Sequence, residues 1–220
     1  MPPGPTPPAR TEPTGGPGRW LGPIAALVPV KAFGQAKGRL AGALGATQRA
    51  ELARAMAAAV VASASPLPVA VVCDDAEVAT WARSRGALVV WEPGRGLNGA
   101  VEAGVDLLRQ AGVERVVVAH ADLPRATRLA QLAGRSGITL VPDRRRDGTN
   151  VIVVDTSIGF RFSYGPGSFE RHRAETNRLA VTLHIVEDPA LTFDLDWPTD
   201  LADLAGLELA ALVRRTGNQP

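Results

Sequence analysis

Short runs rich in apolar residues recur along the chain and alternate with segments whose apolar residues repeat at helical spacing. The apolar runs, typical of buried strands, are 24–30, 68–73, 87–91, 115–120, 138–142, 151–155 and 181–187. Helical spacing is found at 47–64, 76–86, 97–112, 126–134, 167–180 and 197–215. Strands that alternate with helices predict a parallel sheet covered on both faces. Because some of the later strands follow each other without a helix, we expect an α/β fold with three α/β/α layers and a mixed, mostly parallel sheet.

The two ends of the chain differ from its middle in composition. Residues 1–22 are rich in proline and glycine and predict a disordered tail without the apolar core of a signal peptide. Residues 23–213 are expected to form a single domain, with a frayed C-terminus at 214–220. No apolar run approaches the roughly 20 residues that span a bilayer, and a single cysteine, Cys73, is typical of the reducing cytoplasm. We therefore expect a cytoplasmic protein without a membrane partner.

The charge of the chain changes this picture little. The formal net charge is +2, from 24 Lys and Arg against 22 Asp and Glu. A nucleic-acid-binding protein usually carries a basic stripe or tail, which this balance gives no reason to expect. The basic residues are therefore of interest where they cluster locally.

Ligands of parallel sheets bind at the carboxyl ends of the strands, and polar residues follow nearly every predicted strand. Lys31, Lys37 and Arg39 lie in a glycine-bearing loop after the first strand. Cationic side chains and free main-chain N–H groups together suit a polyphosphate, although neither G-x-x-x-x-G-K-[ST] nor G-x-G-x-x-G is present. A solvated loop with ordinary surface lysines is an equal alternative.

Three carboxylates are candidate ligands of a divalent cation. Asp122 directly follows the fourth predicted strand, and Asp194 and Asp196 lie two residues apart, on one face of an extended segment. Carboxylates on one face repel each other unless a cation lies between them, and Mg²⁺ prefers such oxygen ligands. The alternatives are a helix N-cap for Asp122 and a solvated loop for the other two. We interpret Asp200 as a charge in the first turn of the last helix.

Two further segments carry candidate anion contacts. "PDRRRDGTN", residues 142–150, places three arginines between two strands, where they either clamp a carboxylate bidentately or, for at least two of them, are solvated loop charges. Gly165, Gly167 and Ser168 open a predicted helix, whose N-terminus is an anion site unless Ser168 merely caps it. Thr47 is the expected cap of the helix at 47–64.

Several motifs taken together resemble a known family. "VPVKAFGQAKGRL", "GLNGAVEAG", "ADLP", "PDRRRDGTN", "FSYGPGSFERH" and "DLDWPTDL" occur in the order found in the guanylyltransferases of deazaflavin coenzyme F-420 biosynthesis, and the resemblance spans about residues 24–205. It implies a nucleotidyltransferase fold of the glycosyltransferase-A type. It also implies GTP, Mg²⁺ and a small phosphorylated three-carbon acid, with GMP transferred to the phosphate of the acid and pyrophosphate released.

The same resemblance implies roles for residues of this chain. The expected contacts of the triphosphate are Lys31, Lys37 and Arg39, and those of the guanosine are Gly96, Leu97 and Asn98. The expected ligands of Mg²⁺ are Asp122, Asp194 and Asp196. The expected contacts of the acid are Thr149, Gly165 and Ser168. The chain departs from the family pattern at Gly38, where serine is common, and at Asp147, where a second glycine is common; both departures bear on the choice of acid.

The sequence leaves several alternatives open. We favour phosphoenolpyruvate as the acid because the composition is typical of a GC-rich bacterial genome, with 2-phospho-L-lactate and 3-phosphoglycerate as alternatives. A glycosyltransferase on the same fold and a non-catalytic GTP-sensing module are rival functions. Molybdenum-cofactor nucleotidyl transfer is a third, but its usual "GGxSxRMG" opening is absent. Whether the protein is a homodimer also stays open.

Overall fold

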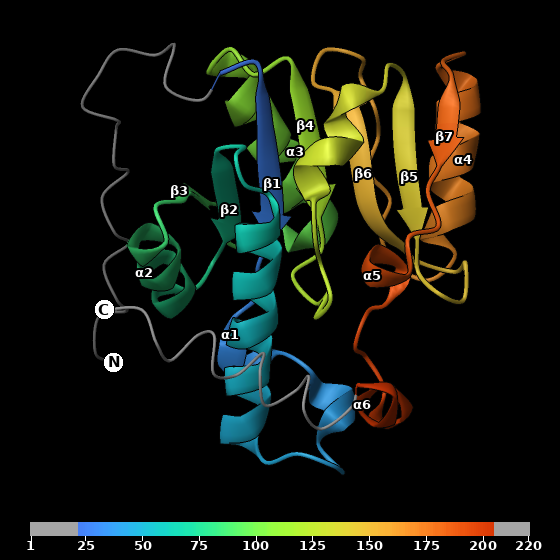
Figure 1. Ribbon diagram of the computed structural model, residues 1–220. Helices are drawn as coiled ribbons and strands as arrows, with labels where there is room; N and C mark the ends of the chain where they lie inside the picture. The colour runs from blue at the N-terminus through green and yellow to red at the C-terminus, as the bar shows by residue number, and fades with distance from the viewer. Residues whose placement is uncertain (1–21, 205–220) are drawn as a thin grey trace.

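A seven-stranded sheet forms the centre of the protein in the computed structural model, which describes residues 22–204 (Figure 1). The strands are β1 (Ile24–Pro29), β2 (Val69–Cys73), β3 (Leu88–Trp91), β4 (Arg115–Ala119), β5 (Ile138–Pro142), β6 (Thr149–Asp155) and β7 (Leu183–Ile185). Their order across the sheet is β3-β2-β1-β4-β6-β5-β7. Almost all of the expected N-terminal tail and the expected frayed C-terminus lie outside the described residues. The expectation of one continuous helix at 197–215 is wrong, because the helix Pro198–Asp203 ends before Leu204, which is extended with ψ 92°; the positions after 204 lie outside the described residues.

The directions of the strands confirm a mixed, mostly parallel sheet. β1 pairs in parallel with β2 and β4, β2 with β3, and β5 with β7. Only β6 among these strands is antiparallel to its neighbours, β4 and β5. The short loop at 143–148 reverses the chain between β5 and β6, whereas the parallel neighbours need long crossover connections. The carboxyl ends of β1, β2, β3 and β4 therefore meet at one edge of the sheet.

Helices cover both faces of the sheet. They are α1 (Ala46–Ser63), α2 (Ala76–Ser84), α3 (Gly96–Gln110), α4 (Ser168–Arg178), α5 (Pro189–Thr192) and α6 (Pro198–Asp203), with 3₁₀ turns η1 (Phe33–Gln35), η2 (Gly38–Leu40) and η3 (Leu129–Gly134). One core joins α1, α2 and η3 to alternate strand residues, and a second joins α3 and α4 to the others. On β1, for example, Val28 belongs to the first core and Leu27 to the second. This alternation confirms the three layers.

Two local expectations about helices are wrong. The segment 126–134 forms only the 3₁₀ turn η3, which begins after Arg128 in a left-handed conformation with φ 52°. So short a segment gains few hydrogen bonds against the cost of nucleating an α-helix. Helix α1 begins one residue before Thr47, with Gly45 as its N-cap, because the Gln48 side chain accepts a hydrogen bond from the Gly45 N–H at 2.9 Å. Thr47 therefore lies inside the first turn.

A third, smaller core places the last described segment beside the loop that follows β1. Its buried members include Leu40 of η2, Met56 of α1, and Phe193 and Leu195. Figure 1 shows α6 next to the loop after β1, although the two are far apart in the sequence. This packing brings the residues around Asp194 and Asp196 to the edge where β1 and β4 end. No helix within residues 22–204 combines the length and apolar character needed to cross a membrane.

Candidate active site

A cavity of about 460 Å³ opens at the carboxyl ends of the parallel strands. Its wall includes residues at or just after the ends of β1, β2, β3 and β4, together with the first turn of α3 and two residues of α1, Ala53 and Met56. Five of the site residues expected from the sequence line it: Lys31, Lys37, Gly96, Leu97 and Asp122. Away from the cavity, helix α3 packs tightly on β1, since a Cβ at Gly104 would lie 2.9 Å from a methyl carbon of Leu27. Residues from three separate sequence motifs thus line the same cavity.

Lys37 lies between two carboxylates at this cavity. Its Nζ is 2.9 Å from Oδ2 of Asp122 and 2.8 Å from Oδ1 of Asp196, and its side chain is only 8% exposed. Burial alone would lower the pKa of the Lys37 ammonium, but the charges of Asp122 and Asp196 outweigh burial and raise it. Arg39 adds a second cation, with Nη1 3.1 Å from the other oxygen of Asp196. The lysine is therefore charged and holds two carboxylates that are 74 residues apart in the sequence.

Two buried carboxylate oxygens in this region have no hydrogen-bond partner: Oδ1 of Asp122 and Oδ1 of Asp194. Burial, reinforced by the charge of Asp122, raises the pKa of Asp194 to about 6. Unpartnered buried acceptors are costly, and a hard divalent cation satisfies them, so the donor set fits such an ion. Within residues 22–204, however, no three acidic, His or Cys side chains are close enough together to hold a metal. A site made of Asp122, Asp194 and Asp196 stays a prediction, and it requires Lys37 to move.

The residues expected near the guanosine separate into two groups. Gly96 and Leu97 line the cavity, and Gly96 has a φ of 64°, which a side chain would strain. Asn98 is not part of the cavity wall. Its Oδ1 accepts a hydrogen bond from the Tyr164 N–H at 2.6 Å, and its Nδ2 lies 3.4 Å from the Tyr164 carbonyl. Asn98 thus joins the first turn of α3 to the segment before α4.

The three residues expected at the acid lie near each other but not on the wall of this cavity. Thr149 and Ser168 are buried, and Gly165 has a φ of 116°. Oγ1 of Thr149 is 2.9 Å from Nδ1 of His172, whose Nε2 accepts a hydrogen bond from the Ser163 N–H at 3.0 Å. The proton of the neutral ring is therefore on Nδ1, which donates to Thr149. The alternative that Ser168 caps α4 is wrong, since the N-cap is Gly167 with φ 70° and no side-chain cap bond.

His172 gives the folded state a defined pH dependence. Burial, together with the charge of Arg171, lowers the pKa of His172 to about 4. The unfolded chain binds this proton near pH 6.5, so the stabilisation is complete above that pH and is lost as the pH falls towards 4. We expect the wild-type protein to lose about 2 kcal/mol more unfolding free energy between pH 7.5 and pH 5 than His172→Asn does. Urea unfolding at both pH values measures this; equal losses in the two proteins would contradict it.

The arginines of the loop at 143–148 are exposed, as expected for solvated loop charges, but each of them also pairs with a carboxylate of the chain itself. Arg144 contacts Asp200 and Asp203, and Arg145 contacts Asp200. Arg146 pairs with Glu187. No local spacing in the sequence indicates these partners.

Asp200 is more than a charge in the first turn of α6. It is 1% exposed, and its Oδ2 accepts hydrogen bonds from the N–H groups of Asp196 and Trp197 at 2.8 and 2.7 Å. Sequence reasoning missed this role. The signal was present, since proline at the first helical position and an acidic residue at the third, as in "WPTD", mark a helix N-terminus whose side chain binds backward.

Comparisons with solved structures show the fold. A putative nucleotide-diphospho-sugar transferase from Desulfovibrio desulfuricans superposes with a TM-score of 0.71 at 18% identity, covering 88% of this chain and 95% of that one. A nucleotidyl transferase from Methanothermobacter thermautotroptrophicus gives a TM-score of 0.61 at 17% identity, covering 86% and 99%. The expected nucleotidyltransferase fold is confirmed.

Comparisons with sequences show the family. A protein of Sphaerobacter thermophilus named phosphoenolpyruvate guanylyltransferase is 33% identical over 190 residues, which cover 82% of this chain and 92% of the relative. Another of the same name, from Roseiflexus castenholzii, is 36% identical over 184 residues, covering 82% and 87%. The family described as "Guanylyl transferase CofC like" matches residues 24–206. In this chain, basic and acidic residues from several motifs lie together at one edge of a nucleotidyltransferase sheet. The chain therefore belongs to the CofC-like guanylyl transferase family.

Proposed function

We propose that this protein transfers GMP from GTP to the phosphate of phosphoenolpyruvate, releasing pyrophosphate and forming enolpyruvyl-2-diphospho-5'-guanosine. The observation that carries the proposal is the contact of Lys37 with Asp122 and Asp196 at the cavity, in a chain of this family. The names of the relatives support phosphoenolpyruvate as the acid. A reducing cytoplasm, where both substrates are found, is the location we propose.

The chemistry requires mainly that charge be neutralised. The attacking phosphate oxygen is already ionised, so no strong general base is needed, and the barrier lies in bringing an anion to a polyanion. Two unit charges about 4 Å apart repel by roughly 4 kcal/mol at an effective dielectric of 20. We assign Lys31, Lys37 and Arg39 to the triphosphate, where their charges stabilise the departing pyrophosphate. In-line positioning of the two substrates supplies the remaining rate acceleration.

A divalent cation, which we propose to be Mg²⁺, would be held by Asp122, Asp194 and Asp196. When bound, it supplies Lewis-acid stabilisation of the charge that develops on the transferred phosphoryl group. The carboxylates have a second task that needs no metal: they hold the ammonium of Lys37 beside the cavity before nucleotide arrives. When nucleotide binds, the Lys37 ammonium moves from the carboxylates to the triphosphate. This movement frees the carboxylates for the cation, so nucleotide binding and metal binding are coupled.

We assign Thr149, Gly165 and Ser168 to the acid substrate. Because His172 donates its Nδ1 proton to Oγ1 of Thr149, the hydroxyl proton of Thr149 is directed away from the ring. It is then available to a carboxylate or phosphate oxygen of the acid. Asn98 of α3 accepts a hydrogen bond from the backbone N–H of Tyr164. This bond connects the acid-binding segment to the nucleotide-binding helix.

The test is to incubate the protein with GTP and Mg²⁺ and, in separate reactions, phosphoenolpyruvate, 2-phospho-L-lactate or 3-phosphoglycerate. Mass spectrometry identifies the product, and a coupled assay measures pyrophosphate. We expect the diphosphate-linked guanosine with phosphoenolpyruvate, and none when EDTA is added or ATP replaces GTP. GTP binding without pyrophosphate release would instead indicate a GTP-sensing module, and product with another acid only would correct the substrate.

A further inference from the structure

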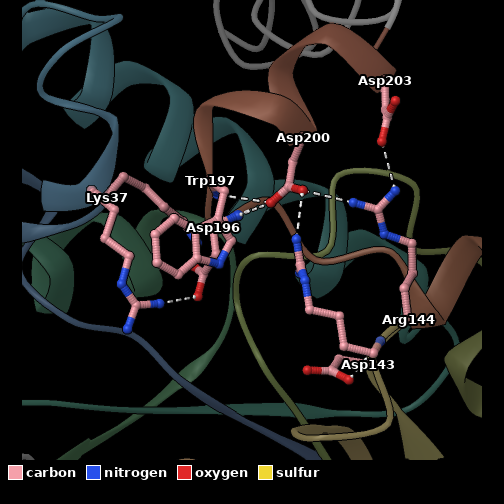
Figure 2. Close-up of polar contacts among 9 residues, drawn as sticks. Lys37, Asp143, Arg144, Asp196, Trp197, Asp200 and Asp203 are labelled. Carbon is pink, nitrogen blue, oxygen red and sulfur yellow. Dashed lines mark hydrogen bonds and ion pairs between the residues drawn. The ribbon is translucent and has the colours of Figure 1, made fainter.

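The loop at 143–148 contacts both ends of the segment 193–200, which carries Asp194 and Asp196. Figure 2 shows Arg144 reaching Asp200 and Asp203, and Asp200 reaching the backbone at Trp197 and Asp196. We propose that Arg144 is a positioning residue that acts through Asp200 to fix the backbone at Asp196, and through Phe193 to fix the backbone before Asp194. The inference rests on the proposed function, in which these two carboxylates serve guanylyl transfer.

Both oxygens of the Asp200 carboxylate have hydrogen-bond partners in this network. Its Oδ1 is 2.7 Å from Nη2 of Arg144 and 3.3 Å from Nη2 of Arg145, and its Oδ2 accepts from the two backbone N–H groups. A buried carboxylate that keeps its charge needs such partners. Hydrogen bonds therefore connect Arg144, through Asp200, to the backbone at Asp196.

The same guanidinium also contacts the other end of the segment. The carbon of the Arg144 guanidinium lies 4.3 Å from the ring centroid of Phe193, and that of Arg125 lies 4.3 Å from the same centroid. Phe193 is buried in the small core and directly precedes Asp194. Contacts of this kind are stronger where the cation is partly desolvated, as for Arg144 with a side chain 30% exposed. The Arg144 side chain thus contacts both the first and the last residue of the segment 193–200.

The loop that carries Arg144 is itself ordered by Asp143. Its Oδ1 accepts hydrogen bonds from the N–H groups of Arg145 and Asp147 at 2.9 and 3.0 Å, and its Oδ2 accepts from Gly148 at 2.9 Å. A Cβ at Gly148 would lie 2.9 Å from that oxygen, so the turn favours glycine there. With its backbone held at three points, the loop presents Arg144 from a fixed base. This arrangement explains three arginines between two strands without a substrate contact.

The test compares Arg144→Gln with Arg146→Gln, a control in the same loop whose partner, Glu187, lies outside the network. Mn²⁺ binding to the nucleotide-free protein is measured by the electron paramagnetic resonance of free Mn²⁺, and steady-state kinetics are measured with phosphoenolpyruvate. For Arg144→Gln we expect Mn²⁺ affinity to fall by about 10-fold and kcat by about 10- to 100-fold. KM for the acid is expected to change by less than about 3-fold. Arg146→Gln is expected to match the wild type in all three.

Arg144→Lys provides the conservative variant, because lysine restores one ion pair with Asp200 but not the planar contact with Phe193. We expect intermediate values of Mn²⁺ affinity and kcat, and this variant together with Arg145→Gln carries the test if circular dichroism shows Arg144→Gln to be unfolded. Wild-type Mn²⁺ affinity in folded Arg144 variants would overturn the proposal. So would a raised KM for the acid with unchanged kcat, the mark of a substrate clamp. If the wild type bound Mn²⁺ but made no product, the proposed function would fail while the Mn²⁺ comparison still tested the positioning role.

Discussion

Replacing Asp122 with asparagine is expected to lower kcat for guanylyl transfer on the order of 10²–10³-fold, the range seen when one electrostatic contact of a transition state is lost. Asp122 has one oxygen on Lys37 and one buried oxygen without a partner. Asparagine keeps the shape but removes the charge, so both the attraction for a cation and the hold on Lys37 weaken. The Asp122 carbonyl accepts from the Leu195 N–H, and this bond is unaffected by the substitution, so the fold is expected to persist.

The measurement is kcat at saturating GTP, acid and Mg²⁺, with circular dichroism to verify folding. Asp106→Asn is the matched control, because Asp106 is an exposed carboxylate on α3 that pairs only with Arg109 among the described residues. We expect that control to retain wild-type kcat. A folded Asp122→Asn enzyme with wild-type turnover would show that Asp122 is not a ligand of the required cation.

Replacing Lys37 with glutamine is expected to have two effects of opposite sign. The value of kcat/KM for GTP falls by about 10²-fold, because a cation that stabilises the triphosphate is lost. Binding of Mn²⁺ to the nucleotide-free protein becomes roughly 10-fold tighter, because the ion no longer has to displace charged hydrogen bonds of the kind worth about 1.5–3 kcal/mol. Lys37 is suited to this exchange because it contacts both Asp122 and Asp196.

Arg39→Gln separates the two roles of Lys37. Arg39 touches Asp196 but not Asp122, and its side chain is 59% exposed, so its loss should tighten Mn²⁺ binding much less. Kinetics with GTP and resonance titration with Mn²⁺ alone provide both readouts for both variants. Unchanged Mn²⁺ affinity in Lys37→Gln would contradict the idea that this lysine occupies the place of the cation before substrate binds.

Local patterns in the sequence predict the sheet well and the short helices less well. Continuous apolar runs such as 115–120 and 151–155 are long enough to identify strands, and the alternation of strands with helices predicts the layers. The segment 126–134 was predicted as a helix because spacing alone does not reveal how few hydrogen bonds so short an element makes. The preference of threonine for the N-cap position led to Thr47 as the expected start of α1. The N-cap is instead Gly45, whose N–H donates to the Gln48 side chain.

The candidate site is predictable where residues follow strands and unpredictable where they pair across the fold. The rule that ligands meet at strand ends was enough to bring Lys31, Lys37 and Asp122 together. The pairing of Arg144 with Asp200 joins residues 56 positions apart, and nothing in the spacing of either motif encodes it. The same holds for the tautomer of His172, which depends on a backbone N–H from another segment.

The most direct measurement is a crystal structure of the protein with a non-hydrolysable GTP analogue and Mg²⁺. We predict the triphosphate at Lys31, Lys37 and Arg39, an ion coordinated by Asp122 and by Asp194 or Asp196, and the Lys37 ammonium moved from the carboxylates to the phosphates. A triphosphate bound away from the 460 Å³ cavity, or an ion that touches none of the three carboxylates, would contradict the account.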